Sequence, residues 1–503
     1  MSAAWIMQAR EENSWLYTSA DYVGSVQGTD FVTWPCYERF YQPAVIINTI
    51  MVGVLAFHGT IIHCTTPTET KVLKDTLLVV TPDGRISYIK PGIPESDVQD
   101  ALSQLQLPEL PIPRVLSQTE FLIPGFVDTH NHAPQWAQRG LGGGMHILDW
   151  LEQITFPNEA KFEDPEHARK VYSSCVDGFI KQGVTTCSYY GSLHGEATKV
   201  LVDICLAKGQ RALIGKCNMD RNAPDYYRDK NAAESMAVTK DVIDHVRSLD
   251  PSGALIKPIL TPRFAICCDD ELLANLGSLA TQNPDLPIQT HFNEAQQEID
   301  ATLNLFPNFT NEADLYDYYG LLTNRSILAH CTIMTDYEID KLRHADSGIA
   351  HCPIANTTVG GGFMAAPIGK FLEKGIKVGL GTDSGGGFSS SILDAIRLAT
   401  IVSNARHLMT GEPALSVWQC FYLATLGGAR VCSLDDKIGN FQVGKDFDAL
   451  VIQADTDGVM TMIQEQDNVE TIFEKFLISG DDRNIAEVYA KGRQLKGTVS
   501  SPL

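Results

Sequence analysis

Two histidines separated by a single residue, His130 and His132, are the residues of this chain best suited to metal chemistry. They close an apolar, β-branched run that starts at Ile123 and is typical of a buried strand. Because residues two apart in a strand point to the same face, both imidazoles are expected to project together from the strand end. Two adjacent imidazoles are half of a metal site, so the other ligands must come from elsewhere in the chain.

Three later segments each place a possible ligand at the end of a predicted strand, namely His291, His330 and Asp383. Imidazole nitrogens and a carboxylate oxygen suit zinc or ferrous iron better than Mg²⁺ or Ca²⁺. A single histidine at a strand end is more often a core or capping residue than a ligand. Five such residues at strand ends, in this order, predict a metal centre.

The chemistry expected of such a centre is hydrolysis. A zinc ion lowers the pKa of a coordinated water to about 7, which supplies hydroxide at neutral pH. The reaction also needs a proton carrier, and Glu294 lies three residues after His291, close to the expected metal. A glutamate in a surface loop is usually only solvated, so this role depends on its adjacency to His291.

The elements that must position these residues follow an alternating pattern of strands and helices, which predicts parallel βα units. With the strand that carries His130 there are eight candidate strands in about 260 residues, the count and size of a (β/α)8 TIM-type barrel. Barrel enzymes place their chemistry at the carboxyl ends of the strands, where all five candidates fall. The other predicted strands are 183–190, 211–219, 256–264, 287–294, 326–332, 348–354 and 377–383, and predicted helices include 165–182, 196–208, 335–344 and 389–409.

Both ends of the chain carry short β-rich runs separated by turns, which predict one small β-sandwich domain built from N- and C-terminal segments. The expected division is an extension of unknown structure (1–46), the first part of the β domain (47–118, with a linker or insertion at 92–118), the barrel (119–433) and the second part of the β domain (434–503). The extension holds Trp5, Trp15 and Trp34. It is either a loosely packed segment, the interpretation we favour, or an oligomer contact.

Charge and cysteine content narrow the partners and the compartment. Lys and Arg total 39 against 61 Asp and Glu, a net charge of -22 that repels phosphate backbones and anionic membranes. We therefore expect a small-molecule substrate, no nucleic-acid polymer and no membrane partner. The 12 cysteines form no CxxC pair and the start of the sequence is unlike a secretory leader, which predicts reduced thiols and a cytoplasmic location.

Three motifs carry a resemblance to a known family. The segment 124–136 resembles the first metal motif of the amidohydrolase superfamily, with a substrate-facing glutamine and an aromatic residue. The segments 261–264 and 289–294 are similar to the substrate-binding and third-histidine motifs of the members that deaminate guanine. The likeness runs from about Val52 to the C-terminus. It implies hydrolysis of guanine to xanthine and ammonia, one zinc ion per chain and a homodimer.

The resemblance also implies a role for each site residue. His330 would position the hydroxide, Asp383 would take the proton of the water, and Glu294 would carry protons to N3 and to the departing 2-amino group. Members with two metals carry a lysine at the end of strand four. This chain has Thr261 to Phe264 there, and Lys257 lies too early to substitute, so one metal is expected. The implied metal ligands are His130, His132, His291 and Asp383.

The substrate side can also be argued from the residues. The planar donors of Arg263 match the O6 and N7 acceptors of guanine, although a structural ion pair is the alternative. Gln135 can read a second edge of the base, and Trp136 and Phe264 could sandwich the ring, although such aromatics are more often core. Further contacts are expected from His291, Glu294 and Asp383.

Two other functions compete with this interpretation. A hydrolase of the same superfamily could act on another amino-heterocycle, such as an adenosine derivative, cytosine or a chlorotriazine, but these lack the O6/N7 pair that suits Arg263. A binding protein without catalysis would be free to lose ligands, and this chain keeps all of them. The tripeptide His194-Gly195-Glu196 matches half of the cytidine-deaminase zinc signature but lacks its P-C-x-x-C partner, so we predict that it begins a helix.

Overall fold

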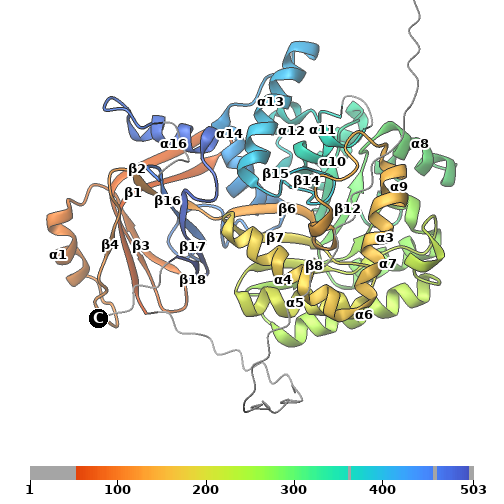
Figure 1. Ribbon diagram of the computed structural model, residues 1–503, viewed down its shortest axis with the longest axis horizontal. Helices are drawn as coiled ribbons and strands as arrows, with labels where there is room; N and C mark the ends of the chain where they lie inside the picture. Colours follow the sequence, from red (N-terminus) through yellow and green to blue (C-terminus); the bar gives the residue numbers. More distant parts are fainter. Residues whose placement is uncertain (1–52, 361–363, 457–461, 498–503) are drawn as a thin grey trace, which may run out of the picture. The chain divides into compact units, whose positions relative to one another are not determined.

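The computed structural model of the 503-residue chain describes residues 53–360, 364–456 and 462–497 (Figure 1). These residues belong to one compact unit. The predicted extension, 1–46, and its tryptophans lie outside the described residues. In the parts that the structure describes, none of the helices is both long and apolar enough to cross a bilayer.

The larger part of the unit is built on parallel strands, and each predicted barrel strand corresponds to one of them. Two of the predicted strands are interrupted: 211–219 becomes β8 and β9 (Cys217–Asn218), and 256–264 becomes β10 and β11 (Thr261–Pro262). The parallel strands are β6 (Phe126–His132), β7 (Val184–Tyr190), β8 (Arg211–Gly215), β10 (Ile256–Pro258), β12 (Ile288–Phe292), β13 (Ser326–His330), β14 (Gly348–His351) and β15 (Lys377–Leu380).

Pairing joins these strands into two parallel four-stranded sheets, in the orders β10-β8-β7-β6 and β12-β13-β14-β15. A parallel bridge between Leu260 and Ile288 lies at one gap between the sheets. At the other gap, the Thr129 hydroxyl donates to the Leu380 carbonyl at 2.8 Å, and the Asp383 amide donates to the His130 carbonyl at 2.9 Å. Hydrogen bonds therefore link the two sheets on both sides, although the ladders themselves do not form one continuous ring.

Helices follow most of these strands, and capping residues set where several of them begin and end. The helix α10 begins at a capping box in which Thr335 and Glu338 satisfy each other's backbone amides, and it ends at Asp346 in the left-handed region. The helix α5 begins directly after His194, as predicted, and ends at Gly209 with φ of 82°. Among the described residues, the helices of ten residues or more are α4 (Pro165–Lys181), α5 (Gly195–Lys208), α6 (Ala232–Leu249), α7 (Asp270–Gln282), α8 (Gln296–Leu305), α10 (Asp336–Ala345), α13 (Ile392–Thr410) and α16 (Val469–Ser479).

The two ends of the chain meet in one mixed sheet of eight strands, so that orange and blue strands lie side by side in Figure 1. The strand β16 pairs antiparallel with β5. Among the described residues this pairing gives a single sheet and does not show the two facing sheets of a sandwich. The predicted linker 92–118 contains a short helix, α1 (Val98–Ser103), and β4. The strands are β1 (Leu55–Thr66), β2 (Glu69–Val80), β3 (Ile86–Lys90), β4 (Arg114–Val115), β5 (Glu120–Pro124), β16 (Ala449–Gln453), β17 (Ile485–Ala490) and β18 (Arg493–Lys496).

One residue, Gly125, separates β5 of this mixed sheet from β6 of the parallel sheet. Its amide donates to the Asp448 carbonyl at 3.0 Å. A Cβ at this position would lie 2.2 Å from the Thr185 hydroxyl oxygen, so only glycine fits between the strands. The strand that ends in His130 and His132 therefore continues directly from the small sheet.

A buried ion cluster ties the amino end of β8 to the C-terminal strands. The Arg211 guanidinium lies 2.9 Å from an Asp446 oxygen and 3.2 Å from an Asp448 oxygen, and it donates to the Ala254 carbonyl at 2.6 Å. The Arg211 and Asp448 side chains are each only 2% exposed. Removing one partner of such a cluster leaves charges without compensation in a nonpolar setting.

We predict that Arg211→Met lowers the free energy of unfolding by about 3–5 kcal/mol, because Asp446 and Asp448 would stay buried without a cation. The matched control is Arg483→Met, since the ion pair of Arg483 with Asp481 is 58% and 38% exposed. That control should cost about 1 kcal/mol or less. Urea unfolding followed by circular dichroism measures both, and equal losses would contradict the prediction.

Candidate metal centre and active-site cavity

Four predicted ligands converge at the carboxyl ends of the parallel strands. His130 and His132 end β6, His291 lies on β12, and Asp383 follows β15. The Asp383 oxygen Oδ1 lies 3.2 Å from His130 Nε2 and 3.5 Å from His132 Nε2, and the His132 and His291 Nε2 atoms are 3.0 Å apart. These spacings suit atoms that surround a single ion at about 2 Å.

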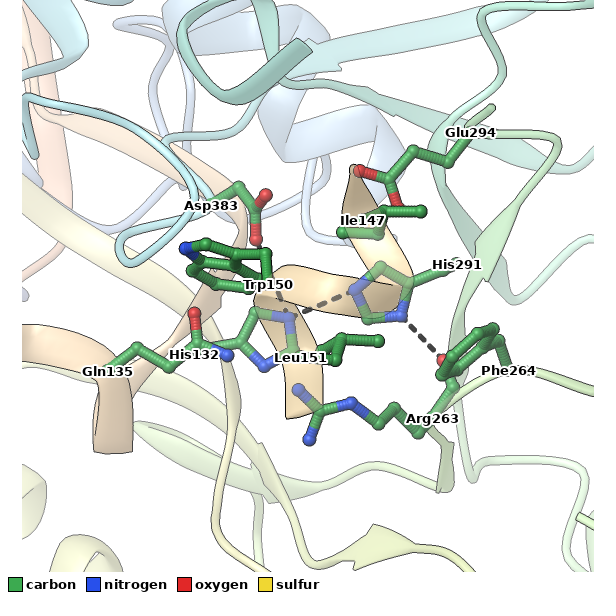
Figure 2. Close-up of a pocket in the computed structure, with 10 residues that line it drawn as sticks. All are labelled: His132, Gln135, Ile147, Trp150, Leu151, Arg263, Phe264, His291, Glu294 and Asp383. Atoms are coloured by element: carbon green, nitrogen blue, oxygen red, sulfur yellow. Dashed lines mark hydrogen bonds and ion pairs between the residues drawn. The ribbon is translucent and has the colours of Figure 1, made fainter. Parts of the chain in front are cut away.

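The protonation state of the imidazoles suits them to bind a cation. Burial, and then the neighbouring positive groups, lower the pKa of His130, His132 and His291 well below the usual value, so the rings are neutral at pH 7. Among the described residues, the buried Nε2 of His130 has no hydrogen-bond partner. The His291 Nδ1–H donates to the Arg263 carbonyl at 2.6 Å, which leaves the Nε2 lone pair for a metal. The four residues therefore form a buried metal-binding group. Three of them, His132, His291 and Asp383, are drawn in Figure 2.

A buried carboxylate beneath the centre, Asp128, joins the two ends of the ligand set. It accepts the amide of His130 at 3.2 Å, and the amide and hydroxyl of Thr382 at 3.1 and 2.6 Å. Thr382 precedes Asp383, so one side chain fixes β6 against the segment that follows β15. Sequence reasoning assigned Asp128 no role, although its place two residues before His130 puts it on the same face of the strand.

Backbone strain concentrates in the same place. His330, Cys331 and Asp383 have φ values of 76°, 48° and 48°, and Asn293, between His291 and Glu294, has a φ of 45°. The left-handed region is unfavourable for residues with side chains, and it persists where surrounding contacts enforce it. The strand ends turn sharply here, which aims His330, Asp383 and Glu294 at one point.

Glu294 and His330 lie beside the metal-binding group. The His330 Nδ1–H donates to Asn356 at 2.7 Å, and its Nε2 lies 3.6 Å from a Glu294 oxygen and 4.0 Å from an Asp383 oxygen. Burial and then the charge of Asp383 raise the pKa of Glu294 well above its usual value. Burial raises the pKa of Asp383 to about 6. Two carboxyl groups that both favour the protonated form more than usual thus lie close together beside His330.

The loop that carries Glu294 is held by buried carboxylates that the sequence analysis did not single out. Glu312 accepts the Asn293 amide at 3.0 Å, and Glu298 accepts the Glu294 amide at 3.2 Å. Glu338 accepts the Asn293 side-chain amide at 2.8 Å. These hydrogen bonds hold the backbone of Asn293 and Glu294 in place and so set the direction in which the Glu294 side chain points.

A small cavity opens onto the metal-binding group, and Figure 2 shows the side chains around it. Six predicted contact residues line it, as does the ligand His132. Ile147, Trp150 and Leu151 also line it and were missed, because nothing in the types or spacing of an irregular helical segment distinguishes a cavity wall from core. The predicted residues that line the cavity are Gln135, Arg263, Phe264, His291, Glu294 and Asp383.

Trp136 is the exception, because the structure does not bring it to the cavity. Its indole N–H donates to Ser174 at 3.1 Å, its ring lies 5.2 Å from that of Phe179, and the Arg139 guanidinium stacks on it at 3.3 Å. Ser174 and Phe179 belong to α4. The short helical turn Ala133–Gln138 starts right after His132 and rotates neighbouring side chains apart, so that Gln135 faces the cavity and Trp136 faces α4.

Arg263 lines the cavity and is also ion-paired, so the structural ion pair offered as the alternative is present, while contact with a base stays a prediction. Its Nη1 and Nη2 atoms donate to Glu159 at 2.8 and 3.3 Å, and both side chains are almost fully buried. Glu159 ends the helix α3 (Phe156–Glu159) and was not among the predicted site residues. A lone glutamate in a polar helix carries no sequence signal of burial.

Neutral imidazoles and a carboxylate at parallel strand ends, with a glutamate of raised pKa beside a small cavity, define a metal-dependent hydrolase. Comparison with known proteins agrees. The chain belongs to the amidohydrolase family, whose model matches residues 121–495. It therefore has the TIM-barrel type of fold of that family, with mixed α/β content.

Three of the similar proteins carry the name guanine deaminase, one of them as probable. The chain is 40% identical over 445 residues to a probable guanine deaminase of Schizosaccharomyces pombe, covering 88% of this chain and 83% of that protein. It is 39% identical over 454 residues to the guanine deaminase of Rattus norvegicus, covering 89% and 98%. The crystal structure of guanine deaminase from C. acetobutylicum with bound guanine has a TM-score of 0.78 and 32% identity, covering 88% and 99%.

We predict that zinc raises the melting temperature of the metal-stripped protein, because an ion that binds only the folded state stabilises it. His291→Ala should abolish most of this shift by removing one ligand. His194→Ala is the matched control, since His194 is a partly buried histidine outside the metal-binding group and should leave the shift intact. Scanning calorimetry with and without zinc measures the three proteins. A full shift in His291→Ala would remove His291 from the ligand set.

Proposed function

We propose that this protein hydrolyses guanine to xanthine and ammonia. The observation that carries the proposal is the cavity beside the metal-binding group, in which Arg263 and Gln135 face the space that a base would fill. The guanine-deaminating relatives, at about two fifths identity over most of the chain, support the same substrate. In the reaction, a water oxygen bonds to C2 of guanine, the C2–N bond of the 2-amino group breaks, and ammonia leaves.

The residues divide the proton transfers between them. His130, His132, His291 and Asp383 would hold the metal, which supplies Lewis acidity at one point of the cavity. The Asp383 carboxylate takes the proton of the attacking water, and the His330 Nε2 orients that water. Glu294, whose pKa burial raises, delivers a proton to N3 of the base. It then takes the hydroxyl proton of the intermediate, passes that proton to the departing amine, and recovers its own proton from Asp383.

The cavity walls hold the ring in place. Arg263 offers N–H donors to the oxygen and nitrogen acceptors of the base, and Gln135 reads a neighbouring edge. The Phe264 ring, 5.8 Å from that of His291, provides a flat surface for stacking. Apolar walls from Ile147, Trp150 and Leu151 exclude bulk water, which strengthens each of these polar contacts.

Further properties belong to the same proposal. We expect zinc as the metal and one ion per chain. The residues offer two sets of possible ligands, the four-residue metal-binding group and a set of Glu294, His330 and Asp383, and both sets use Asp383. We also propose a closed (β/α)8 barrel over 119–433, a small β-sandwich from 47–118 and 434–503, a homodimer and a cytoplasmic location. Family resemblance and composition support them.

The test is ammonia release from guanine by purified protein of known metal content, with adenine and cytosine run beside it. Turnover of guanine, with about one zinc per chain, is the expected result. Turnover of adenine or cytosine in place of guanine would keep the hydrolase and reject the substrate. No ammonia from any of the three, with metal bound, would contradict the proposed reaction.

We predict that Glu294→Gln lowers kcat for guanine by about 10²–10⁴-fold, because the amide keeps the shape of the side chain but cannot release a proton to the base. Metal content should stay unchanged, since Glu294 is outside the four-ligand group. Steady-state kinetics with metal analysis measures both. An active Glu294→Gln enzyme would assign the proton transfers to another group.

A further inference from the structure

Glu159 occupies the centre of a buried hydrogen-bond cluster at the edge of the cavity. Its side chain is 1% exposed, and each carboxylate oxygen accepts two bonds. The oxygen Oε1 accepts from Gln135 Nε2 at 2.7 Å and from Arg263 Nη2 at 3.3 Å. The oxygen Oε2 accepts from Arg263 Nη1 at 2.8 Å and from the Tyr227 hydroxyl at 2.7 Å. One side chain therefore holds both polar residues of the cavity wall that would read a base.

The hydrogen bond with Glu159 determines whether Gln135 offers its amide oxygen or its amide nitrogen to a ligand. A carboxylate can only accept hydrogen bonds, so the atom 2.7 Å from Glu159 has to be the amide nitrogen. The carbonyl oxygen Oε1 then points the other way, and among the described residues it has no hydrogen-bond partner although it is buried. Gly385 closes the other side, because a Cβ there would lie 2.1 Å from that oxygen. Gln135 is thus fixed as an acceptor.

The same carboxylate fixes Arg263 as a donor. Two charge-assisted bonds hold the guanidinium plane, and the sulfur atoms of Cys217 and Met219 lie 3.9 and 3.8 Å from Nη1. A guanidinium has no acceptor and keeps its charge. The cavity therefore presents a fixed donor and a fixed acceptor, and their arrangement depends on one buried anion.

We propose that Glu159 is a positioning residue that sets the hydrogen-bond polarity of the cavity and so selects bases with a lactam edge, in which a ring carbonyl adjoins a ring N–H. This inference rests on the proposed function and adds its specificity determinant. Arg263 pairs with acceptors of the base and Gln135 with an N–H. Bases with an amino group in place of the carbonyl would set a donor against Arg263, which also donates, and a ring-nitrogen acceptor against Gln135, which also accepts.

The neutral substitution Glu159→Gln removes this control while keeping the side-chain volume. A glutamine has one carbonyl oxygen and two N–H donors, so it cannot accept from Gln135, Arg263 and Tyr227 together. Gln135 is then free to turn its NH₂ group toward the cavity, and Arg263 loses its counterion. The matched control is Glu163→Gln, an exposed glutamate four residues further on.

The test compares two ligands that lack the 2-amino group, hypoxanthine, which has the lactam edge, and purine, which does not. Calorimetric Kd values are independent of turnover, and metal content and melting temperature are measured on the same samples. In the wild type and in Glu163→Gln we expect hypoxanthine to bind more tightly than purine. In Glu159→Gln the Kd of hypoxanthine should rise about tenfold to a hundredfold, while that of purine changes little.

Each other outcome has a definite meaning. Equal binding of hypoxanthine and purine by the wild type, or an equal loss of both in Glu159→Gln, would overturn the inference, since the second result marks a merely structural role. Failure of the wild type to release ammonia from guanine would instead reject the proposed function. If Glu159→Gln does not fold, Tyr227→Phe removes only one of the four bonds to Glu159. It should lower the hypoxanthine preference severalfold, and an unchanged preference would overturn the inference.

Discussion

Bringing three imidazoles and a carboxylate together away from water is the constraint on which the rest of this structure depends. Burial disfavours every charged state of these groups, so the histidines stay neutral and their lone pairs need a cation at the centre. Such an arrangement cannot rely on flexible side chains alone. Hydrogen bonds on the side away from the cavity hold the ligands in place. Asp128 joins the two strand ends. The Arg263 carbonyl orients His291, and Asn356 orients His330.

Two buried glutamates at the cavity show how environment divides the tasks of one residue type. Glu159 lies against Arg263 and accepts four hydrogen bonds, so its negative charge is compensated. Among the described residues Glu294 forms no ion pair with an arginine or lysine and lies near Asp383, so burial and like charge raise its pKa. Glu159, held by four accepted hydrogen bonds, can only position its neighbours, whereas Glu294 can carry a proton. The difference lies in the surroundings, because the two side chains are chemically the same.

The metal ligands could be predicted from the sequence because strand geometry is simple. Residues two apart share a face, and the carboxyl ends of parallel strands gather at one edge, so the pattern indicates five strand-end candidates. The family resemblance then singled out His130, His132, His291 and Asp383 from these five, leaving His330 to position the hydroxide. The segment after a strand is harder to predict, and Trp136 was wrongly directed at the cavity because a helical turn after His132 sends it toward α4. Glu159 and Trp150 lie in short, irregular helical segments with no period to read. Their burial is a tertiary effect that no local signal records.

The junction at Gly125 has a consequence for how the chain is made. Synthesis proceeds from the amino end, so β5 and the β6 strand that continues from it emerge long before β16. Until Ala449 arrives to pair with Pro124, the nascent β5 has an open edge that can pair with other chains. The mixed sheet from which the histidine strand continues is thus completed only near the end of translation, and the edge of β5 stays unpaired for most of synthesis.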